Sequence, residues 1–106
     1  MKTNVALEAI DHYDMYSNNQ KKVLKTLIAV SVDNVAYISV NAIAESIKLA
    51  PNSTYVVLRM LENDGCIIRE RKQGQKTNAY KINIDKVEHF VKIYQQKKKG
   101  LNQINK

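Results

Sequence analysis

Hydrophobic side chains recur at helical spacing along the first half of the chain. One such stripe predicts a helix over residues 5–16, with Ala6, Ala9, Ile10 and Tyr13 on its apolar face. The sequence Ser17-Asn18-Asn19 offers cap residues for a second helix that runs to residue 31. Its apolar face carries Val23, Leu24, Leu27 and Ile28. A short β-segment over residues 35–38 follows, and Ser39 can cap a third helix over residues 41–49.

A fourth helix is predicted after the break at Ala50-Pro51, since proline cannot continue the helix before it. Asn52 or Ser53 can cap this helix, which runs to residue 64. Gly65 then supplies the residue that most readily adopts a left-handed cap. Because an α-helix turns by about 100° per residue, the side chains of this helix divide into two opposite faces. One holds Thr54, Val57, Leu58 and Leu61, and the other holds Asn52, Val56, Arg59 and Asn63, with Tyr55 and Met60 at the flanks.

After Gly65 the apolar period changes from that of a helix to that of a strand. Residues 66–71 and 77–84 are predicted to pair as a β-hairpin, joined by a polar tip that contains Gly74. Asp85 and Glu88 then have the spacing of a capping box for a last helix ending near residue 99. Its apolar stripe is Val87, Phe90, Val91 and Tyr94.

This order of elements resembles the winged helix-turn-helix superfamily. Two segments carry the resemblance: Ala44-Glu45-Ser46-Ile47-Lys48-Leu49 before Pro51-Asn52-Ser53-Thr54, and Leu58-Arg59-Met60-Leu61-Glu62-Asn63-Asp64-Gly65 before Cys66-Ile67-Ile68. The resemblance implies an α+β, mostly α fold with a winged core over residues 20–84 and flanking helices over 5–16 and 86–99. We expect one domain over residues 1–96 and a basic, disordered tail over 97–106.

Composition adds one asymmetry to this picture. The 106 residues carry a net charge of +7, in a chain whose 44% hydrophobic and 25% charged residues are typical of a soluble domain. Residues 1–65 hold 6 basic and 7 acidic side chains, whereas residues 66–106 hold 11 basic and 3 acidic ones. This excess indicates an anionic partner that contacts the second part of the chain. With neither a membrane-spanning run nor a signal-peptide core in the sequence, we expect a cytoplasmic protein.

The predicted hairpin, or wing (residues 69–81), is the first candidate for binding that partner. Its cluster of basic side chains is Arg69, Arg71, Lys72, Lys76 and Lys81. Basic residues on a hairpin can follow the phosphates or enter the minor groove of DNA. The alternative is an ordinary charged strand exterior that protects the sheet from aggregation.

The exposed face of the fourth helix (residues 52–64) is the second candidate. Arginine can pair with guanine and asparagine with adenine, while serine and tyrosine can hold phosphates. The helix departs from the superfamily pattern, because it carries a single basic residue against Glu62 and Asp64. A plain solvated face is therefore the competing interpretation. The predicted contact residues are Asn52, Ser53, Tyr55, Val56 and Arg59.

The two flanking helices are not required by a winged core. Their apolar stripes can close over the core of their own chain, or can join two copies of it. Helices outside the winged core commonly form the dimer in the regulators that this chain resembles, and we therefore expect a homodimer. The predicted interface is Ile10, Tyr13, Val87, Phe90, Val91 and Tyr94.

The sequence carries no pattern of residues that suggests catalysis. His12 and His89 are isolated, Cys66 is the only cysteine, and three dispersed glycines cannot form a phosphate-binding loop. We expect no enzyme activity, no metal site and no cofactor. The predicted function is double-stranded DNA binding by a dimeric transcription regulator. Two alternatives stay open: a plasmid or phage replicon protein (a segregation adaptor or replication initiator), and a winged-helix protein–protein adaptor that binds no DNA.

Overall fold

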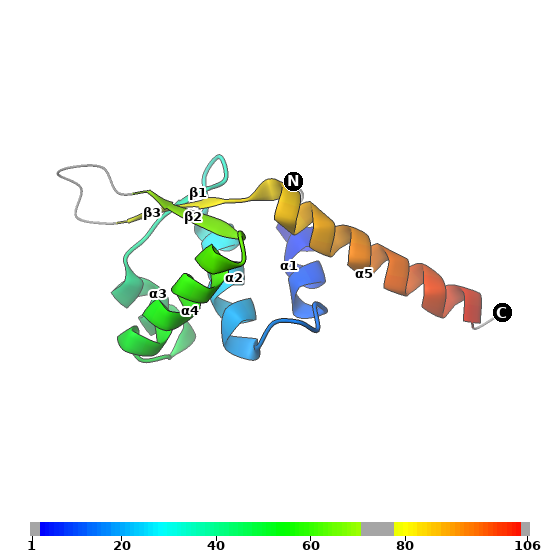
Figure 1. Ribbon diagram of the computed structural model, residues 1–106, viewed down its shortest axis with the longest axis horizontal. Coiled ribbons are helices and arrows are strands. Elements are labelled where there is room, and N and C mark those ends of the chain that lie inside the picture. The colour runs from blue at the N-terminus through cyan, green and yellow to red at the C-terminus, as the bar shows by residue number, and fades with distance from the viewer. Residues whose placement is uncertain (1–2, 71–77, 105–106) are drawn as a thin grey trace.

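The computed structural model describes residues 3–70 and 78–104, with the side chains of residues 3–70 and 78–99. Helices cover one face of a small antiparallel sheet, whose strand order is β1-β3-β2 (Figure 1). The elements are α1 (Thr3–Asp11), α2 (Asn18–Val30), β1 (Val35–Tyr37), α3 (Val40–Ile47), α4 (Pro51–Asn63), β2 (Ile67–Glu70), β3 (Ala79–Ile82) and α5 (Ile84–Ile104). This arrangement confirms the predicted α+β, mostly α class.

Side-chain caps fix where the helices begin. Ser17 accepts from the backbone N–H of Gln20 and the Gln20 side chain accepts from Ser17, which completes a capping box for α2. Ser39 caps α3 in the predicted way, by accepting from Ala42. The expected caps of the last two long helices are wrong. Pro51 itself starts α4, because its missing N–H needs no partner in the first turn.

Asn83, rather than Asp85, caps α5. Its side-chain oxygen accepts from the backbone N–H of Lys86 at 3.4 Å, and its carbonyl accepts from Val87 at 3.2 Å. Its amide nitrogen also donates to the carbonyl of Gly65 at 2.8 Å, so the start of α5 is tied to the end of α4. An asparagine can make both contacts because its amide carries a donor and an acceptor.

The sheet places one face on the core. Ile67 pairs with Ile82, and Arg69 pairs with Tyr80 two positions further along. Ile67, Tyr80 and Ile82 are each at most 2% exposed, whereas Ile68 and Lys81 point to the opposite, exposed face. The alternation of buried and exposed side chains along β3 is thus the strand period that the sequence shows.

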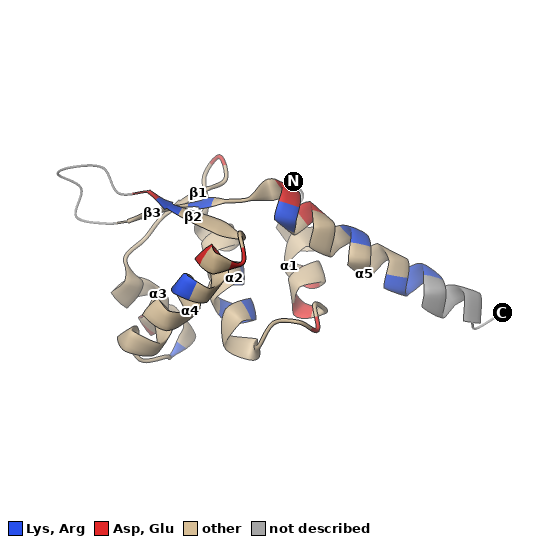
Figure 2. Ribbon diagram, in the orientation of Figure 1, with Lys and Arg blue, Asp and Glu red and all other residues tan. Residues whose placement is uncertain are grey.

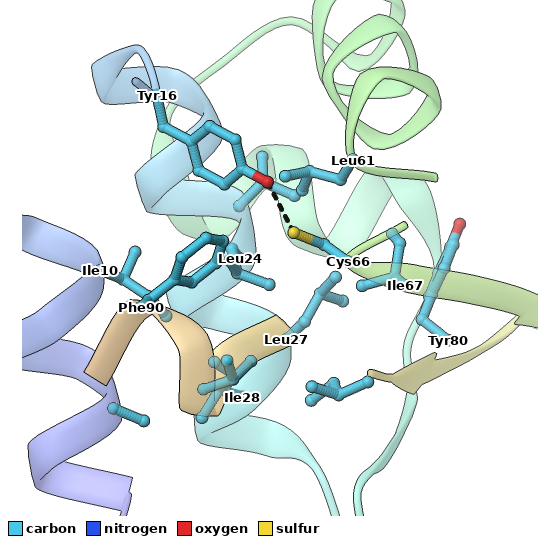
Figure 3. Close-up of a cluster of buried hydrophobic side chains, with 14 of the residues drawn as sticks. Ile10, Tyr16, Leu24, Leu27, Ile28, Leu61, Cys66, Ile67, Tyr80 and Phe90 are labelled. Carbon is cyan, nitrogen blue, oxygen red and sulfur yellow. Dashed lines mark hydrogen bonds between the residues drawn. The ribbon is translucent and has the colours of Figure 1, made fainter. Parts of the chain in front are cut away.

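A single hydrophobic cluster joins the helices to the sheet. Leu24, Leu27 and Ile28 of α2 lie in its centre, between the α1–α5 pair and the sheet (Figure 3). Three aromatic rings close the cluster beside α5. The Phe90 ring lies 4.3 Å from that of Tyr13 and 5.5 Å from that of Tyr16. Aromatic rings at these separations attract each other in addition to the apolar area they bury.

The flanking helices close over their own chain. Ile10, Val87, Phe90 and Tyr94 are at most 9% exposed in this single chain, and Tyr13 and Val91 pack against the same cluster. Four of the six residues of the predicted dimer interface are thus covered within one chain, whereas Tyr13 and Val91 keep partial exposure. Of the two interpretations of the flanking stripes, the structure favours closure over one core.

Helix α5 continues beyond the position where the sequence predicts a disordered tail. It is helical through Ile104 and projects beyond the other elements, so that the whole molecule is 58 Å long (Figure 1). Lys97 links this part of the helix to the connection between α1 and α2. Its ammonium group lies 2.7 Å from the Asp14 carboxylate and donates to the carbonyl of His12 at 3.4 Å. Among the described residues, no helix is long and apolar enough to span a membrane.

Replacing Phe90 with alanine tests whether the α1–α5 closure belongs to the core. The substitution removes a ring that is 1% exposed and contacts two tyrosines, and we expect a loss of about 3–5 kcal/mol in the free energy of unfolding. The exposed Lys92→Ala on the same helix serves as control and should change stability by at most about 0.5 kcal/mol. Urea unfolding followed by circular dichroism measures both. Equal stability of the two variants would show that α5 is not part of the core.

Candidate nucleic-acid interface

Helix α4 leaves one complete face uncovered. Thr54, Val57, Leu58 and Leu61 point into the core, as the sequence predicts. Thr54 is fully buried, and its hydroxyl donates to the carbonyl of Ala50 at 3.0 Å, so it adds no unsatisfied group. The opposite face carries every predicted contact residue of this helix in an exposed position: Asn52, Ser53, Tyr55, Val56 and Arg59.

Two apolar groups stand out on this face. Tyr55 is 43% exposed and Val56 is 56% exposed, and Met60 extends the apolar surface one turn further along the helix. Burial of such groups against a partner is favourable, in proportion to the apolar area removed from water. The face therefore suits contact with another molecule rather than solvent alone.

A charged cluster connects α4 to the first strand of the wing. The Glu62 carboxylate lies 3.9 Å from the Nε of Arg59 and 3.4 Å from the Nε of Arg69. The Tyr55 hydroxyl accepts from an Nη1–H of Arg59 at 3.3 Å. Hydrogen bonds from Arg59 and then Arg69 lower the pKa of the Tyr55 phenol. Sequence reasoning missed the role of Glu62 here, although its i, i+3 spacing from Arg59 is the usual spacing for a helical ion pair.

The turn between α4 and β2 sets the angle between helix and wing. Gly65 adopts a left-handed conformation with φ of 79°, and the N–H groups of Gly65 and Cys66 bond back to Glu62 and Leu61, each at 3.0 Å. This is the glycine cap that the sequence predicts. Asn83 holds the turn from the other side, since its N–H donates to the carbonyl of Cys66 at 2.8 Å.

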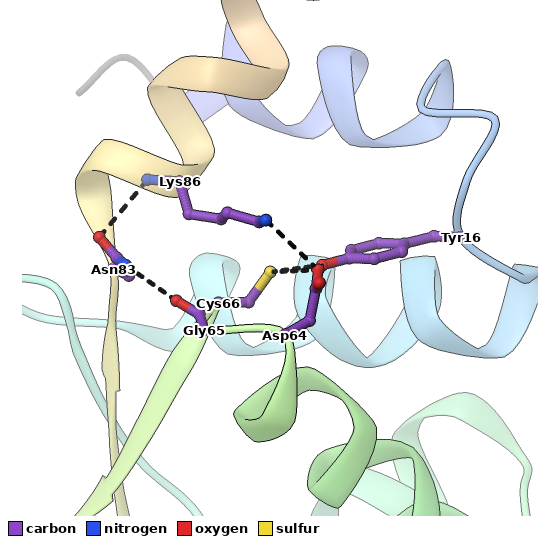
Figure 4. A network of polar contacts seen from close by, with 6 residues as sticks. All are labelled: Tyr16, Asp64, Gly65, Cys66, Asn83 and Lys86. Carbon is purple, nitrogen blue, oxygen red and sulfur yellow. Dashed lines mark hydrogen bonds and ion pairs between the residues drawn. The ribbon is translucent and has the colours of Figure 1, made fainter.

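A polar network lies behind this turn (Figure 4). The Tyr16 hydroxyl donates to the Asp64 carboxylate and lies 2.6 Å from the Cys66 sulfur. The Lys86 ammonium group stands 3.6 Å from the same carboxylate. Burial, followed by the hydrogen bond to Asp64, raises the pKa of the Tyr16 phenol, so this hydroxyl stays a donor at all physiological pH values. Burial likewise raises the pKa of the Cys66 thiol, as is typical of a cysteine packed in a core.

The basic residues of the wing are only partly described. Arg69 lies on β2 and Lys81 on β3, and their register places them on opposite faces of the sheet. Figure 2 shows basic positions on both strands. Arg71, Lys72 and Lys76 fall outside the described residues. The lysines of α2 are partly engaged by α1, because Lys25 pairs with the Asp11 carboxylate at 2.6 Å and Lys21 donates to the Asp11 carbonyl at 2.9 Å. They are therefore weaker candidates for phosphate contact than the wing.

Over residues 3–70 and 78–99, no three His, Cys, Asp or Glu side chains gather where they could hold a metal ion. A groove of about 570 Å³ is an open depression between α1, α2 and α3. Lys22, Lys25 and Lys48 line it beside Asp11, which already pairs with Lys25. The groove does not adjoin the exposed face of α4.

The two-helix step α3–α4, followed by a β-hairpin that pairs with β1, defines a winged helix-turn-helix protein. The fold therefore confirms the resemblance drawn from the sequence. In such domains the second helix of the step enters the major groove.

Comparisons with known proteins support this assignment through structure alone, because no model of a protein family and no curated protein matches the sequence. Similar solved structures include a Staphylococcus aureus MepR mutant bound to an oligodeoxyribonucleotide, with a TM-score of 0.63 and 22% identity over 92% of this chain and 71% of MepR. YusO of Bacillus subtilis has a TM-score of 0.60 and 16% identity over 96% of this chain and 68% of YusO.

A Lactococcus lactis ZitR mutant in complex with DNA has a TM-score of 0.60 and 18% identity, over 89% of this chain and 62% of ZitR. ZitR is described as a zinc-responsive MarR family member, and MepR as a transcription regulator of a multidrug efflux pump. At these identities the likeness establishes only the fold that the chain shares with these proteins.

The network behind the Gly65 turn should contribute measurably to stability. Tyr16→Phe removes the hydroxyl that donates to Asp64 and leaves the ring in the core, and we expect a loss of about 1–2 kcal/mol in the free energy of unfolding. Tyr37→Phe, on an exposed tyrosine, is the matched control and should be neutral. Chemical denaturation of the three proteins measures the difference. A neutral Tyr16→Phe would mean that the network does not hold the turn.

Proposed function

We propose that this protein is a double-stranded DNA-binding transcription regulator. Helix α4 enters the major groove, and the wing (residues 69–81) lies on the flanking backbone or in the minor groove. The observation that carries the proposal is the position of the exposed face of α4, which lies next to the strands that lead into the basic wing. The function is binding rather than catalysis, and a protein that acts on chromosomal or plasmid DNA is expected in the cytoplasm.

Charge and fold support the proposal independently. Eleven of the 17 basic side chains lie in residues 66–106, together with only 3 acidic ones, which suits a polyanion. Two of the structural neighbours, MepR and ZitR, were solved with DNA. Within α4, Arg59 can pair with guanine, Asn52 can pair with adenine, and Val56 can contact a thymine methyl group.

A homodimer is part of the proposal, formed through a surface other than the predicted one. The distal part of α5 projects from the rest of the molecule, and a second copy of the chain can pack along it (Figure 1). A dimer would place two α4 helices on half-sites about 34 Å apart, one turn of the duplex. Light scattering of the purified protein should give twice the monomer mass of 12.1 kDa. A monomer at micromolar concentration would overturn this part of the proposal.

The apolar groups on α4 favour a second candidate, a protein–protein adaptor. Tyr55, Val56 and Met60 are between 43% and 56% exposed, and the helix holds one basic residue only. A replicon function on repeated DNA sites is the third possibility, and cooperative loading on clustered direct repeats would identify it. Selection of bound duplexes from a random pool separates the adaptor from the two DNA-binding candidates, because an adaptor enriches no sequence.

Salt dependence is the first test of DNA binding. The logarithm of the duplex affinity should fall linearly with the logarithm of the salt concentration, with a slope of about −0.9 for each phosphate neutralised. Arg71, Lys72 and Lys76 changed together to glutamine should weaken binding to all sequences alike and should flatten this slope. Filter binding at several salt concentrations measures both effects. The absence of duplex binding at about 50 mM salt, where electrostatic attraction is strong, would refute the proposed function.

Arg59 tests the recognition helix. Arg59→Ala should reduce discrimination between the selected duplex and a scrambled one by about 1–3 kcal/mol. Arg59→Lys is the matched control, because it keeps the charge and loses the planar fork. We expect the lysine variant to retain affinity for scrambled DNA and to lose discrimination. If both variants discriminate as well as the wild type, α4 does not read bases through Arg59.

A further inference from the structure

Glu62 is the one acidic side chain that contacts both candidate DNA-binding elements in the described structure. It lies on α4, within 3.9 Å of Arg59 on the same helix and 3.4 Å of Arg69 on β2. The Glu62 side chain is 20% exposed, less than those of Arg59 (52%) and Arg69 (37%). The carboxylate is thus less accessible to solvent than either guanidinium, and it lies within ion-pair distance of both.

Arg59 is held from both directions along the helix. Glu62 lies three residues after it, and the Tyr55 hydroxyl lies four residues before it and accepts from Nη1. The Arg59 guanidinium carbon is 6.0 Å from the centre of the Tyr55 ring. These contacts use Nε and one N–H of Nη1, while a guanidinium has five N–H groups in a planar fork. The fork can thus still reach two acceptors on a base edge.

Fixing an arginine before binding changes recognition in two ways. The side chain loses less conformational entropy on binding, since it is already ordered, and a base contact gains accordingly. A neighbouring carboxylate also offsets part of the positive charge, which weakens the attraction to phosphates of any sequence. Both effects raise discrimination, the first by favouring the correct base and the second by disfavouring binding elsewhere.

We propose that Glu62 is a positioning residue that orients Arg59 for base contact and joins it to Arg69, so that α4 and the wing engage the duplex as one unit. Glu62 itself contacts no DNA, and the inference rests on the DNA-binding function proposed above. Ion pairs this exposed add little to stability. The consequence of losing Glu62 should therefore appear in recognition rather than in folding.

Glu62→Gln tests the proposal, with Glu88→Gln on the exposed surface of α5 as a control of equal charge change. The measured quantity is the ratio of affinities for the selected and the scrambled duplex at fixed salt. We expect Glu62→Gln to bind scrambled DNA more tightly and to lose roughly tenfold in this ratio, within the range of one base contact. Glu88→Gln should leave the ratio unchanged. An unchanged ratio in Glu62→Gln, or an equal change in both variants, would overturn the proposal.

A double-mutant cycle distinguishes positioning from a general structural effect. In the Arg59→Ala background, Glu62→Gln should cause no further loss of discrimination, because the residue through which it acts is gone. A further loss of the same size would show that Glu62 acts independently of Arg59. If Glu62→Gln unfolds at a lower denaturant concentration, Glu62→Asp, which keeps the carboxylate, should restore discrimination. A wild-type protein that binds no duplex would refute the proposed function itself, before Glu62 is tested.

Discussion

The left-handed turn at Gly65 determines where the two candidate DNA-binding elements lie. With φ of 79°, the chain leaves α4 and enters β2 within three residues, so the helix and the wing start from one point. A side chain at this position would meet no neighbour, and the requirement for glycine is therefore conformational. Asn83 and the Tyr16–Asp64–Lys86 network hold the turn from α5 and from the α1–α2 connection. The remote helices thus support the interface without forming part of it.

The two parts of the sequence, residues 1–65 and 66–106, contribute different elements to the candidate interface. The near-neutral first part supplies the exposed face of α4, the basic second part supplies the wing and α5, and both contribute side chains to the core. Arg59 and Arg69, one from each part, meet at Glu62. The face of α4 with a single basic residue therefore does not act alone, because a second guanidinium approaches it from the sheet. The low charge of the helix is compatible with base reading once this neighbour is included.

The fold could be predicted because local sequence determined most of its elements. The Ser17 and Ser39 caps, the Gly65 turn and the buried side of α4 all follow from short-range patterns. The interface of the flanking helices could not be predicted, since an apolar stripe is the same whether its own core or a second chain covers it. The sequence did not predict Asn83 as the cap of α5, because its side chain is also held by the carbonyl of Gly65, 18 residues away in the chain. The Glu62–Arg69 pair could not be predicted either, because it depends on how α4 and β2 lie in the folded chain.

The central claim is that the exposed face of α4 and the wing bind duplex DNA together. Amide chemical shifts of the labelled protein, measured by nuclear magnetic resonance during titration with the selected duplex, test it most directly. Our account predicts that the largest changes map to residues 52–59, Arg69 and Lys81, with none along the α1–α5 contact around His12 and Tyr94. Changes centred on α5 with an unaffected α4, or no changes at low salt, would contradict it.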